Sequence, residues 1–356
     1  MNLGQGYGDN PKYIAEAIHK KGKEYDIVWL CRNKEDKFPP YIRPVDYRSL
    51  RGIYEQVTAK VWIDNRRKPI YVEKRKGQYY IMTWHGAFTG KKVEKEVEDK
   101  MPETYIKAAQ KDSEMADLFI SPSQFDTQRY RESFWYDGEI LECEMPRDDI
   151  LFSITEDEKN AIKERLKIDK NDKVVLYAPT FRAGEDETSL ANYRIGWDSL
   201  ITALQKRFGG KWRGIVRLHP TIAGLSEKLK YPADVINATN YPDMQELLAI
   251  ADCLISDYSS SVFEFGLIRK PVFLYAADLQ DYLGDRGFVL DIHKWPFDVA
   301  ETDEELADLI GTFDDKKYQK KLDEYYIDRI GKFPLKLGSE EVANRIIEVV
   351  EGTYNK

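Results

Sequence analysis

Three consecutive serines stand between an apolar run and a helix-like pattern in the second half of the chain. The apolar run ends at Leu254 and Ile255, the serines occupy residues 259–261, and residues 262–266 fit a buried helix. A strand that leads through such a turn into a helix presents free N–H groups and the positive end of the helix dipole to an anion. Ser259 and Ser260 are therefore predicted to bind phosphate. The competing interpretation is that Ser259 is a helix cap, since Ser is a favoured capping residue.

Three other strand-like runs also end in residues that can contact a phosphate or move a proton. They are residues 79–83, followed by Trp84, His85 and Gly86; residues 173–177, followed by Pro179, Thr180 and Arg182; and residues 214–216, followed by Arg217 and His219. In doubly wound α/β sheets, ligands bind at the carboxyl ends of the strands. These segments and the serine turn therefore predict a cleft between two domains.

His85 is the predicted general base. Imidazole titrates near neutrality, and a positioned base contributes roughly 10²–10⁴-fold to a rate. The following Gly86 lets another group approach closely, since it has no side chain. The alternative is structural: His85 hydrogen-bonds a backbone group and shapes the turn.

Five further side chains are predicted to complete a diphosphate site. Arg217 and His219 share a face if their segment is extended, and together they predict a phosphate clamp. Arg182 and Arg147 can join that clamp. Glu264 lies one helical turn after the serines and can accept hydrogen bonds from ribose hydroxyls. The structural alternatives are a surface arginine with a turn histidine, salt-bridged loop arginines and a surface glutamate.

Strand and helix patterns alternate twice along the chain, which predicts an α/β fold with parallel sheets. The expected helices and strands are, in order, helix 11–21 with Asn10 as its cap, strands 25–30, 60–63 and 79–83, helix 102–112, strand 118–121, helix 124–134 capped by Ser123, helix 156–166, strand 173–177, helix 197–208, strand 214–218, helix 242–251, strand 253–255, helix 262–266 and strand 271–275. We place the first domain at residues 1–150, the second at 151–338 and a C-terminal helix at 339–356, packing back toward the first domain.

The composition and the absence of several common motifs exclude some classes of function. A net charge of -8 over 356 residues disfavours a nucleic-acid surface. No apolar run approaches the roughly 20 residues that span a bilayer, and the first residues do not resemble a signal peptide. Three distant cysteines fit reduced cytosolic thiols. The sequence has no P-loop, no G-x-G-x-x-G fingerprint, no H-E-x-x-H and no G-x-S-x-G elbow, so it predicts a diphosphate site without a classical dinucleotide motif.

Taken together, the motifs resemble those of the CDP-glycerol glycerophosphotransferase family, the teichoic-acid primases and polymerases. The matching segments are YGDNPKYIAEAI near the start, TWHG at 83–86, SPSQFD at 121–126, PRDD at 146–149, LYAPTFR at 176–182, RLHP at 217–220, ISDYSSSVFEFGLIRKPVFLY at 255–275 and RGFVLD at 286–291. The resemblance implies a GT-B fold, in which two Rossmann-like domains face a cleft and the second domain binds most of the nucleotide.

The resemblance also implies transfer of an alditol phosphate, usually glycerol phosphate, from a CDP donor to an acceptor hydroxyl, with release of CMP. His85 is then the base for the acceptor, and His219 is assigned with it as a catalytic residue that contacts the donor phosphates. The implied donor site comprises Gly86, Arg147, Pro179, Thr180, Arg182, Arg217, Ser259, Ser260 and Glu264. No cofactor is required, although a magnesium ion is compatible. The implied partners are a CDP-alditol and a polyol-phosphate or capsular glycan acceptor, which a lipid can carry.

Several departures leave alternatives open. Many family members continue TWHG with Thr-Pro-Leu-Lys, whereas this chain has AFTGK at 87–91. Ribitol phosphate or another polyol phosphate can therefore replace glycerol phosphate. A nucleotide-sugar glycosyltransferase and a non-catalytic nucleotide-binding subunit are the other hypotheses. The expected location is the cytoplasm, with peripheral contact at the inner face of the plasma membrane. Trp62, Arg66, Arg67 and Lys68 are the suggested basic-aromatic patch, and a strand-end turn is its alternative.

Overall fold

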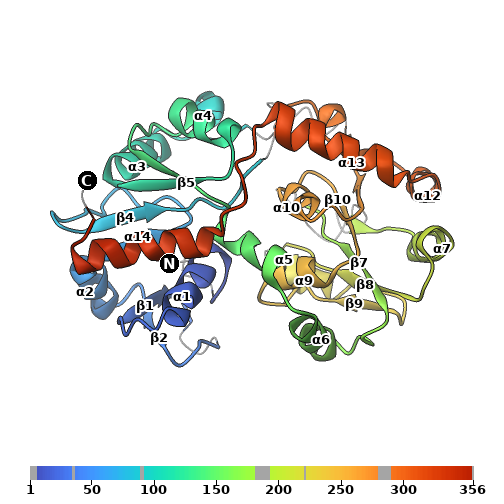
Figure 1. The fold of residues 1–356 in the computed structure, drawn as a ribbon, viewed down its shortest axis with the longest axis horizontal. Coiled ribbons are helices and arrows are strands. Elements are labelled where there is room, and N and C mark those ends of the chain that lie inside the picture. The colour runs from blue at the N-terminus through green and yellow to red at the C-terminus, as the bar shows by residue number, and fades with distance from the viewer. Residues whose placement is uncertain are drawn as a thin grey trace. The chain divides into compact units, whose positions relative to one another are not determined.

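A computed structural model describes residues 6–33, 37–88, 92–180, 193–219, 222–279 and 290–354. The chain forms two compact units, which are shown as ribbons in Figure 1. The first unit contains Met1–Phe88, Val93–Asp149 and Ile330–Lys356, and the second contains Ile150–Arg329 together with Thr89–Lys92. Residues 330–338, which we had placed in the second domain, thus belong to the first unit. The backbone explains this placement, because Gln124 N–H donates to Gly331 O at 3.0 Å and Glu144 N–H to Lys336 O at 3.0 Å.

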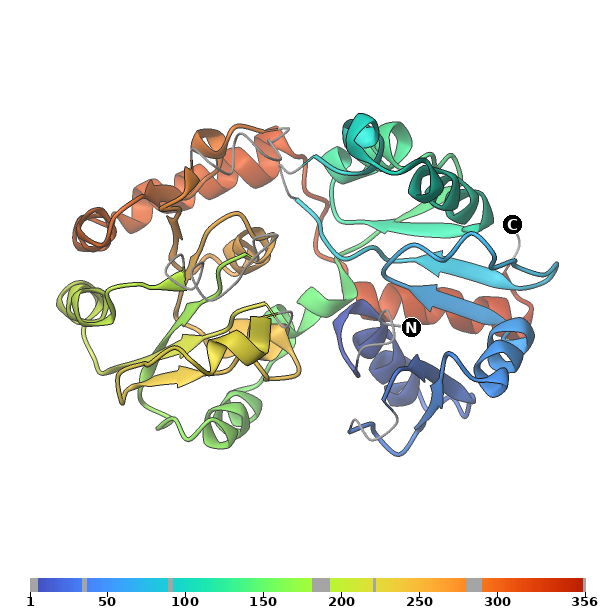
Figure 2. The same cartoon turned by 180° about the vertical axis from the view of Figure 1, so that it is seen from behind.

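All strand pairs of the first unit are parallel. One pair consists of β1 (Ile27–Cys31) and β2 (Ile42–Asp46), and a separate four-stranded sheet has the order β3-β4-β5-β6. Figure 2 shows the β1–β2 pair set apart from the larger sheet. A pocket of about 500 Å³ is lined by residues of both sheets, among them Trp29 and Ile63, and by residues of three helices, among them Ala15, Thr58 and Ile346. The strands of the larger sheet are β3 (Val61–Asp64), β4 (Tyr79–Met82), β5 (Leu118–Ser121) and β6 (Glu139–Glu142).

The helices of the first unit follow from local sequence signals. The predicted Ser123 cap is confirmed, since its hydroxyl accepts a hydrogen bond from Asp126 N–H at 3.1 Å. The first helix begins at Asp9 with Gly8 as its N-cap, so the prediction that Asn10 is the cap is wrong. The helices are α1 (Asp9–Lys20), α2 (Leu50–Thr58), α3 (Glu103–Met115), α4 (Gln124–Ser133) and α14 (Gly338–Glu351), with 3-10 segments at Glu94–Lys100 and Pro146–Asp148.

The second unit contains one six-stranded sheet in which every neighbouring pair is parallel. Its strand order is β12-β11-β10-β7-β8-β9. Counted from β7, this is the 3-2-1-4-5-6 order of nucleotide-binding α/β sheets, and the order reverses between β7 and β10. The strands are β7 (Lys173–Tyr177), β8 (Trp212–Val216), β9 (Val235–Asn237), β10 (Cys253–Ser256), β11 (Val272–Tyr275) and β12 (Asp298–Ala300).

Helices cover the sheet of the second unit, and those predicted at 156–166, 197–208, 242–251 and 262–266 match within three residues. The helices near residues 149, 223, 303 and 315 were not predicted. The helices are α5 (Asp149–Ser153), α6 (Glu156–Arg165), α7 (Trp197–Phe208), α8 (Ala223–Ser226), α9 (Met244–Ile250), α10 (Ser261–Leu267), α12 (Asp303–Gly311) and α13 (Asp315–Asp323). Cys31, Cys143 and Cys253 are buried and free. No helix within the described ranges has the length and apolarity to cross a membrane.

The last helix, α14, is tied to the first unit at its N-terminus. The Asp149 carboxylate accepts hydrogen bonds from Gly338 N–H at 2.9 Å and Ser339 N–H at 2.7 Å. Burial nevertheless raises the pKa of Asp149 to about 6. Figure 1 shows α14 running beside α1. A Cβ added at Gly338 would lie 1.9 Å from Glu144 O, so the backbone of α14 approaches that segment as only glycine allows.

We therefore expect Gly338→Ala to destabilise the first unit by about 1–3 kcal/mol, since the added methyl group meets backbone atoms that must shift. Urea unfolding followed by circular dichroism measures this change. Gly311→Ala is the matched control, because a Cβ at this helical glycine meets nothing within 4 Å. The control should be neutral or stabilising by about 0.4–1 kcal/mol. Equal midpoints for the two variants would contradict the close approach.

Candidate functional site

His85 lies in the loop that follows β4, and its imidazole is anchored by the neighbouring loop after β3. Its Nδ1 is 2.8 Å from the backbone oxygen of Asn65. A carbonyl oxygen only accepts, so Nδ1 carries the proton of the neutral ring and Nε2 keeps a lone pair. The backbone hydrogen bond of the structural alternative is therefore present. The same bond selects the tautomer that a general base needs.

The electrostatic surroundings keep His85 neutral. The pKa of His85 is lowered to about 4, chiefly by burial, and the nearby cations Arg66 and Arg147 act in the same direction. The hydrogen bond to Asn65 and the charge of Asp9 act in the opposite direction without offsetting the burial. At neutral pH the ring is thus uncharged and able to accept a proton at Nε2.

Asn10 connects His85 to two other segments of the first unit. Its fully buried side chain donates from Nδ2 to Trp84 O at 3.0 Å and accepts from Arg147 N–H at 3.0 Å. Trp84 has a φ of +57°, which is strained for a bulky residue and is held by such contacts. Arg147 Nη1 also pairs with the Asp9 carboxylate at 3.2 Å. Arg147, predicted for the donor site, therefore belongs to the unit that carries His85.

Sequence reasoning missed Asp9 and Asn10 as members of this site. Both lie in the YGDNPKY segment, which we used as the start of a helix and as a segment matching the family, without assigning either residue to the site. No local signal identifies their partners, because Trp84 and Arg147 lie far away in the sequence. Asn65 was also missed, and no signal identifies it, because its backbone oxygen is the contacting atom.

In the second unit, the predicted residues gather at the switch point between β7 and β10. The buried Asp257 carboxylate accepts hydrogen bonds from Thr180 N–H at 2.9 Å, from the Thr180 hydroxyl and from Tyr258 N–H at 2.6 Å. The Ser256 hydroxyl donates to Ala178 O at 2.6 Å. Asp257 thus joins the two strand ends. We missed it, although it stands directly between the strand and the serine run.

The serine turn shows features of both competing interpretations. The Ser259 hydroxyl accepts from Ser261 N–H at 3.3 Å and lies 2.9 Å from the Ser261 hydroxyl, which is local capping. Ser260 is the N-cap of α10, yet its side chain makes no capping bond. Both Ser259 and Ser260 are half-buried. The Ser260 hydroxyl is therefore not used by the helix, and phosphate binding by both serines stays a prediction.

Glu264 and Arg217 are both more buried than surface residues would be. Glu264 is 2% exposed, and its Oε2 accepts from Gln245 Nε2 at 2.7 Å, so the surface-glutamate alternative is wrong. Arg217 Nη1 donates to Tyr241 O at 2.6 Å, and its N–H donates to the last residue of β7 at 2.9 Å. Burial lowers the pKa of Arg217 to about 10, so it remains cationic at neutral pH.

The other predicted donor residues occupy different environments. His219 is exposed, Pro179 is buried and Gly86 is half-buried. Arg182 lies outside the described residues. No three His, Cys, Asp or Glu side chains gather as a metal site in the part of the chain that the structure describes. The prediction that no cofactor is required stays a prediction.

The suggested basic-aromatic patch is wrong as a surface. Trp62 is buried, and Arg67 and Lys68 are buried in ion pairs, Arg67 with Glu94 at 3.1 Å and Lys68 with a carboxylate of its own loop. Only Arg66 is exposed. A buried charge requires a paired partner, and adjacent acidic residues supply these partners here. The strand-end turn, the alternative, describes the segment.

Two α/β units with parallel sheets and polar strand ends define the GT-B class of transferases. A protein of Listeria monocytogenes described as a putative UDP-N-acetylglucosamine 2-epimerase shares this fold, with a TM-score of 0.55, 14% identity, and 98% and 96% of the two chains covered. A comparison with family models identifies the family within this class. The chain belongs to the CDP-glycerol:poly(glycerophosphate) glycerophosphotransferase family, whose model matches residues 2–350.

Curated relatives and solved structures agree with this membership. The teichoic acid poly(glycerol phosphate) polymerase of Staphylococcus epidermidis is 32% identical over 91% of this chain and 46% of its own length. The teichoic acid glycerol-phosphate transferase of Staphylococcus aureus is 30% identical over 88% and 82%. The wall teichoic acid polymerase TagF superposes with a TM-score of 0.86 at 30% identity, over 100% of this chain and 89% of that one. The chain spans about half the length of the S. epidermidis polymerase.

The unusual state of His85 leads to a direct spectroscopic expectation. Long-range ¹H–¹⁵N spectra of histidine-labelled protein should show a neutral ring protonated at Nδ1, with a midpoint near pH 4. The folded-state pKa lies below the usual value of about 6.5, so protonation favours unfolding and stability falls as the pH drops from 6.5 to 4.

His85→Gln identifies the His85 signals and removes this part of the acid sensitivity, since Gln can still donate to Asn65 O without titrating. A midpoint near 6.5, or a ring protonated at Nε2, would refute the assigned state of His85.

Proposed function

We propose that this chain transfers glycerol phosphate from CDP-glycerol to a hydroxyl of a teichoic-acid-like or capsular polymer and releases CMP. The observation that carries the proposal is the neutral His85, whose Nδ1–H is held by Asn65 O and whose Nε2 is left as a proton acceptor. Its support in the comparisons is the family membership and the solved structure of TagF soaked with CDPG.

The proposed reaction balances as follows. His85 Nε2 removes the proton of the acceptor hydroxyl while the oxygen attacks the phosphorus that carries glycerol. The new P–O bond replaces the bond to the bridging oxygen, which leaves on CMP. The proton on His85 later returns to solvent or to the leaving phosphate. Such transfer depends on in-line positioning and on stabilising charge at the non-bridging oxygens.

The donor side of the proposal uses the switch-point residues of the second unit. Arg217, cationic and held by two hydrogen bonds, supplies charge to the diphosphate together with His219. Ser259 and Ser260 supply hydroxyls, and Glu264 accepts from the ribose. Asp257 acts indirectly, since it fixes Thr180 and the turn before the serines. Pro179, Gly86, Arg182 and Arg147 complete the predicted set.

Glycerol phosphate is preferred over ribitol phosphate as the transferred group. The relatives named for glycerol phosphate are 28–32% identical to this chain over most of its length, whereas the ribitol-phosphate polymerases of S. aureus are 27% identical. The proposed acceptor is a polyol-phosphate polymer, which a lipid can anchor. A CDP-ribitol transferase, a nucleotide-sugar glycosyltransferase and a non-catalytic subunit are the outcomes against which the proposal is tested.

The decisive assay measures CMP release from a panel of CDP-glycerol, CDP-ribitol and nucleotide sugars, with and without glycerol-phosphate acceptors. We expect CMP from CDP-glycerol only when acceptor is present, with phosphorus retained in the product. His85→Gln should lower kcat by about 10²–10⁴-fold and leave the Kd of CDP-glycerol within about threefold, since the lost group acts on the acceptor.

His19→Gln is the matched control, because this exposed histidine of α1 stacks on Tyr41 away from these contacts. A glycoside product would identify a glycosyltransferase, and donor binding without turnover would identify a non-catalytic subunit. Near-normal turnover of His85→Gln would disprove the assignment of the base.

We further propose peripheral contact with an anionic phospholipid surface, such as the inner face of a plasma membrane. The surface that supports it is one face of α2, where Leu50, Ile53, Tyr54 and Val57 are 86%, 54%, 55% and 39% exposed. Their spacing places all four on one side of the helix. Arg48 and Arg51 flank this face, and each is ion-paired, Arg48 with Asp46 at 3.1 Å and Arg51 with Glu55 at 2.5 Å. The exposed apolar face therefore carries the proposal, since such faces are typical of helices that lie in a membrane interface.

Flotation with phosphatidylglycerol-containing vesicles tests this contact. Leu50→Ser/Ile53→Ser should lower the partition coefficient at least tenfold, because burying a Leu or Ile side chain stabilises by roughly 1.5–3 kcal/mol. Ile327→Ser/Leu335→Ser is the matched control, since these side chains are similarly exposed outside α2. Equal flotation of both double variants and the wild type, or no flotation of the wild type, would refute the α2 contact.

A further inference from the structure

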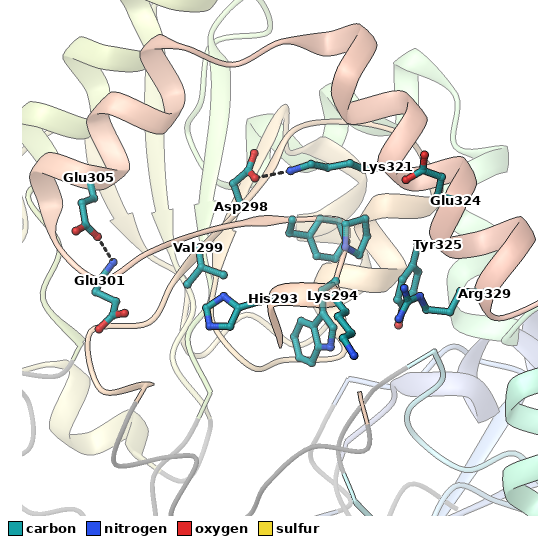
Figure 3. A pocket seen from close by; sticks show the side chains of 13 residues that line it. His293, Lys294, Asp298, Val299, Glu301, Glu305, Lys321, Glu324, Tyr325 and Arg329 are labelled. Carbon is teal, nitrogen blue, oxygen red and sulfur yellow. Dashed lines mark hydrogen bonds and ion pairs between the residues drawn. The ribbon is translucent and has the colours of Figure 1, made fainter. Parts of the chain in front are cut away.

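A pocket of about 390 Å³ lies in the second unit, and none of the predicted donor residues lines it. Figure 3 shows its walls, which come from the 3-10 segment Ile292–Lys294, strand β12, helix α13 and the π-helical segment Glu324–Arg329. The pocket is therefore bounded by an edge strand of the sheet and by the helical segments that precede Ile330. None of its lining residues is assigned a role in the reaction proposed above.

Three cationic or protonatable side chains line this pocket. His293 and Lys294 come from the 3-10 segment and Arg329 from the π-helical segment, and all three are exposed. Within the described part of the chain, neither Lys294 nor Arg329 lies within ion-pair distance of a carboxylate. We call His293, Lys294 and Arg329 the cationic corner. Figure 3 shows Arg329 beside Tyr325, with Lys294 facing the same part of the pocket.

The acidic side chains of the pocket are placed elsewhere and mostly have partners. Asp298 pairs with Lys321, and Glu324 pairs with a lysine one turn earlier at 3.6 Å. Glu305 accepts a hydrogen bond from Glu301 N–H at 2.8 Å. Figure 3 shows Glu301 and Glu305 at the end of the pocket opposite Arg329, with His293 between them. Lys294 and Arg329 thus keep positive charges with which no carboxylate of the described residues forms an ion pair.

The frame behind the corner is rigid. Trp295 and Tyr325 are 4% and 2% exposed, and their rings pack on Phe263 of α10 with centroid distances of 4.8 and 5.4 Å. Trp295 Nε1 donates to Leu290 O at 3.1 Å, which fixes the segment that carries His293 and Lys294. Groups held on a packed frame lose less freedom when a ligand binds, so the corner is preorganised for an anion.

We propose that the cationic corner binds phosphodiester groups in the already polymerised part of the acceptor. This proposal rests on the proposed function, in which the acceptor is a polyol-phosphate polymer. Such a polymer is a polyanion with one negative charge per repeat. Arg and Lys donate charge-assisted hydrogen bonds to phosphate oxygens, and these bonds are strongest when the donors are preorganised. An acceptor with many repeats carries further phosphodiesters that can occupy the corner. An acceptor with a single glycerol phosphate has no further phosphodiester to place there.

Acceptor kinetics test this role of the corner. Lys294→Gln/Arg329→Gln should raise the KM for an acceptor of about ten repeats roughly threefold to tenfold, as expected for two exposed charge contacts. We expect kcat, the KM for CDP-glycerol and turnover of a single-unit acceptor to stay at wild-type values. Lys206→Gln/Lys317→Gln removes the same charge from exposed lysines outside the pocket and should change none of these values.

Direct binding separates this proposal from the catalytic one. A fluorescently labelled glycerol-phosphate oligomer, mixed with the protein without donor, should bind with a Kd that rises with salt and that rises a further threefold to tenfold in Lys294→Gln/Arg329→Gln. Loss of CMP release with every acceptor would overturn the catalytic proposal while this binding difference persists. An unchanged Kd in the double variant, or an equal increase in the lysine control, would overturn the cationic corner.

Discussion

Parallel strand pairing is the constraint on which the polar sites of both units depend. Because all neighbouring strands of a sheet run in the same direction, their carboxyl ends meet at one edge, and the loops that follow them become neighbours. The loop after β3 thereby reaches the loop after β4, and Asn65 O can hold His85. In the second unit, the same rule brings Thr180 next to Asp257, at the point where the strand order reverses.

Buried polar side chains fix the positions of these neighbouring loops by hydrogen-bonding to their backbones. Asn10 and Asp257 are almost completely buried, and each satisfies backbone groups of two segments that are distant in sequence. An unpaired polar group at these positions would cost about 1–3 kcal/mol, so their bonds hold the strained turn at Trp84 and the approach to the serine run. Each residue positions a predicted site residue: Asn10 holds the turn that carries His85, and Asp257 holds Thr180.

Much of the fold was predictable, because the spacing of apolar residues and the capping residues of helices can be read from short stretches of sequence. The alternation of strands and helices, the Ser123 cap and the residues at strand ends all follow from short stretches of sequence. The unpredicted parts depend on distant contacts. The segment after Ile330 joins the first unit through backbone hydrogen bonds to Gln124 and Glu144. No pattern of side chains predicts these bonds. Arg67 and Lys68 looked like a basic surface, because the carboxylates that bury them lie mostly elsewhere in the chain.

The sequence by itself determined the class of fold and the family, and it predicted candidate site residues such as His85 and Glu264, because these depend on residue type and spacing. Only the tertiary structure decided their physical state. Burial of His85 and its bond to Asn65 O set the proton on Nδ1 and lower its pKa, and burial of Glu264 beside Gln245 makes it an internal acceptor. Desolvation and hydrogen-bond partners come from residues far apart in the chain, and the local sequence around a side chain contains no information about them.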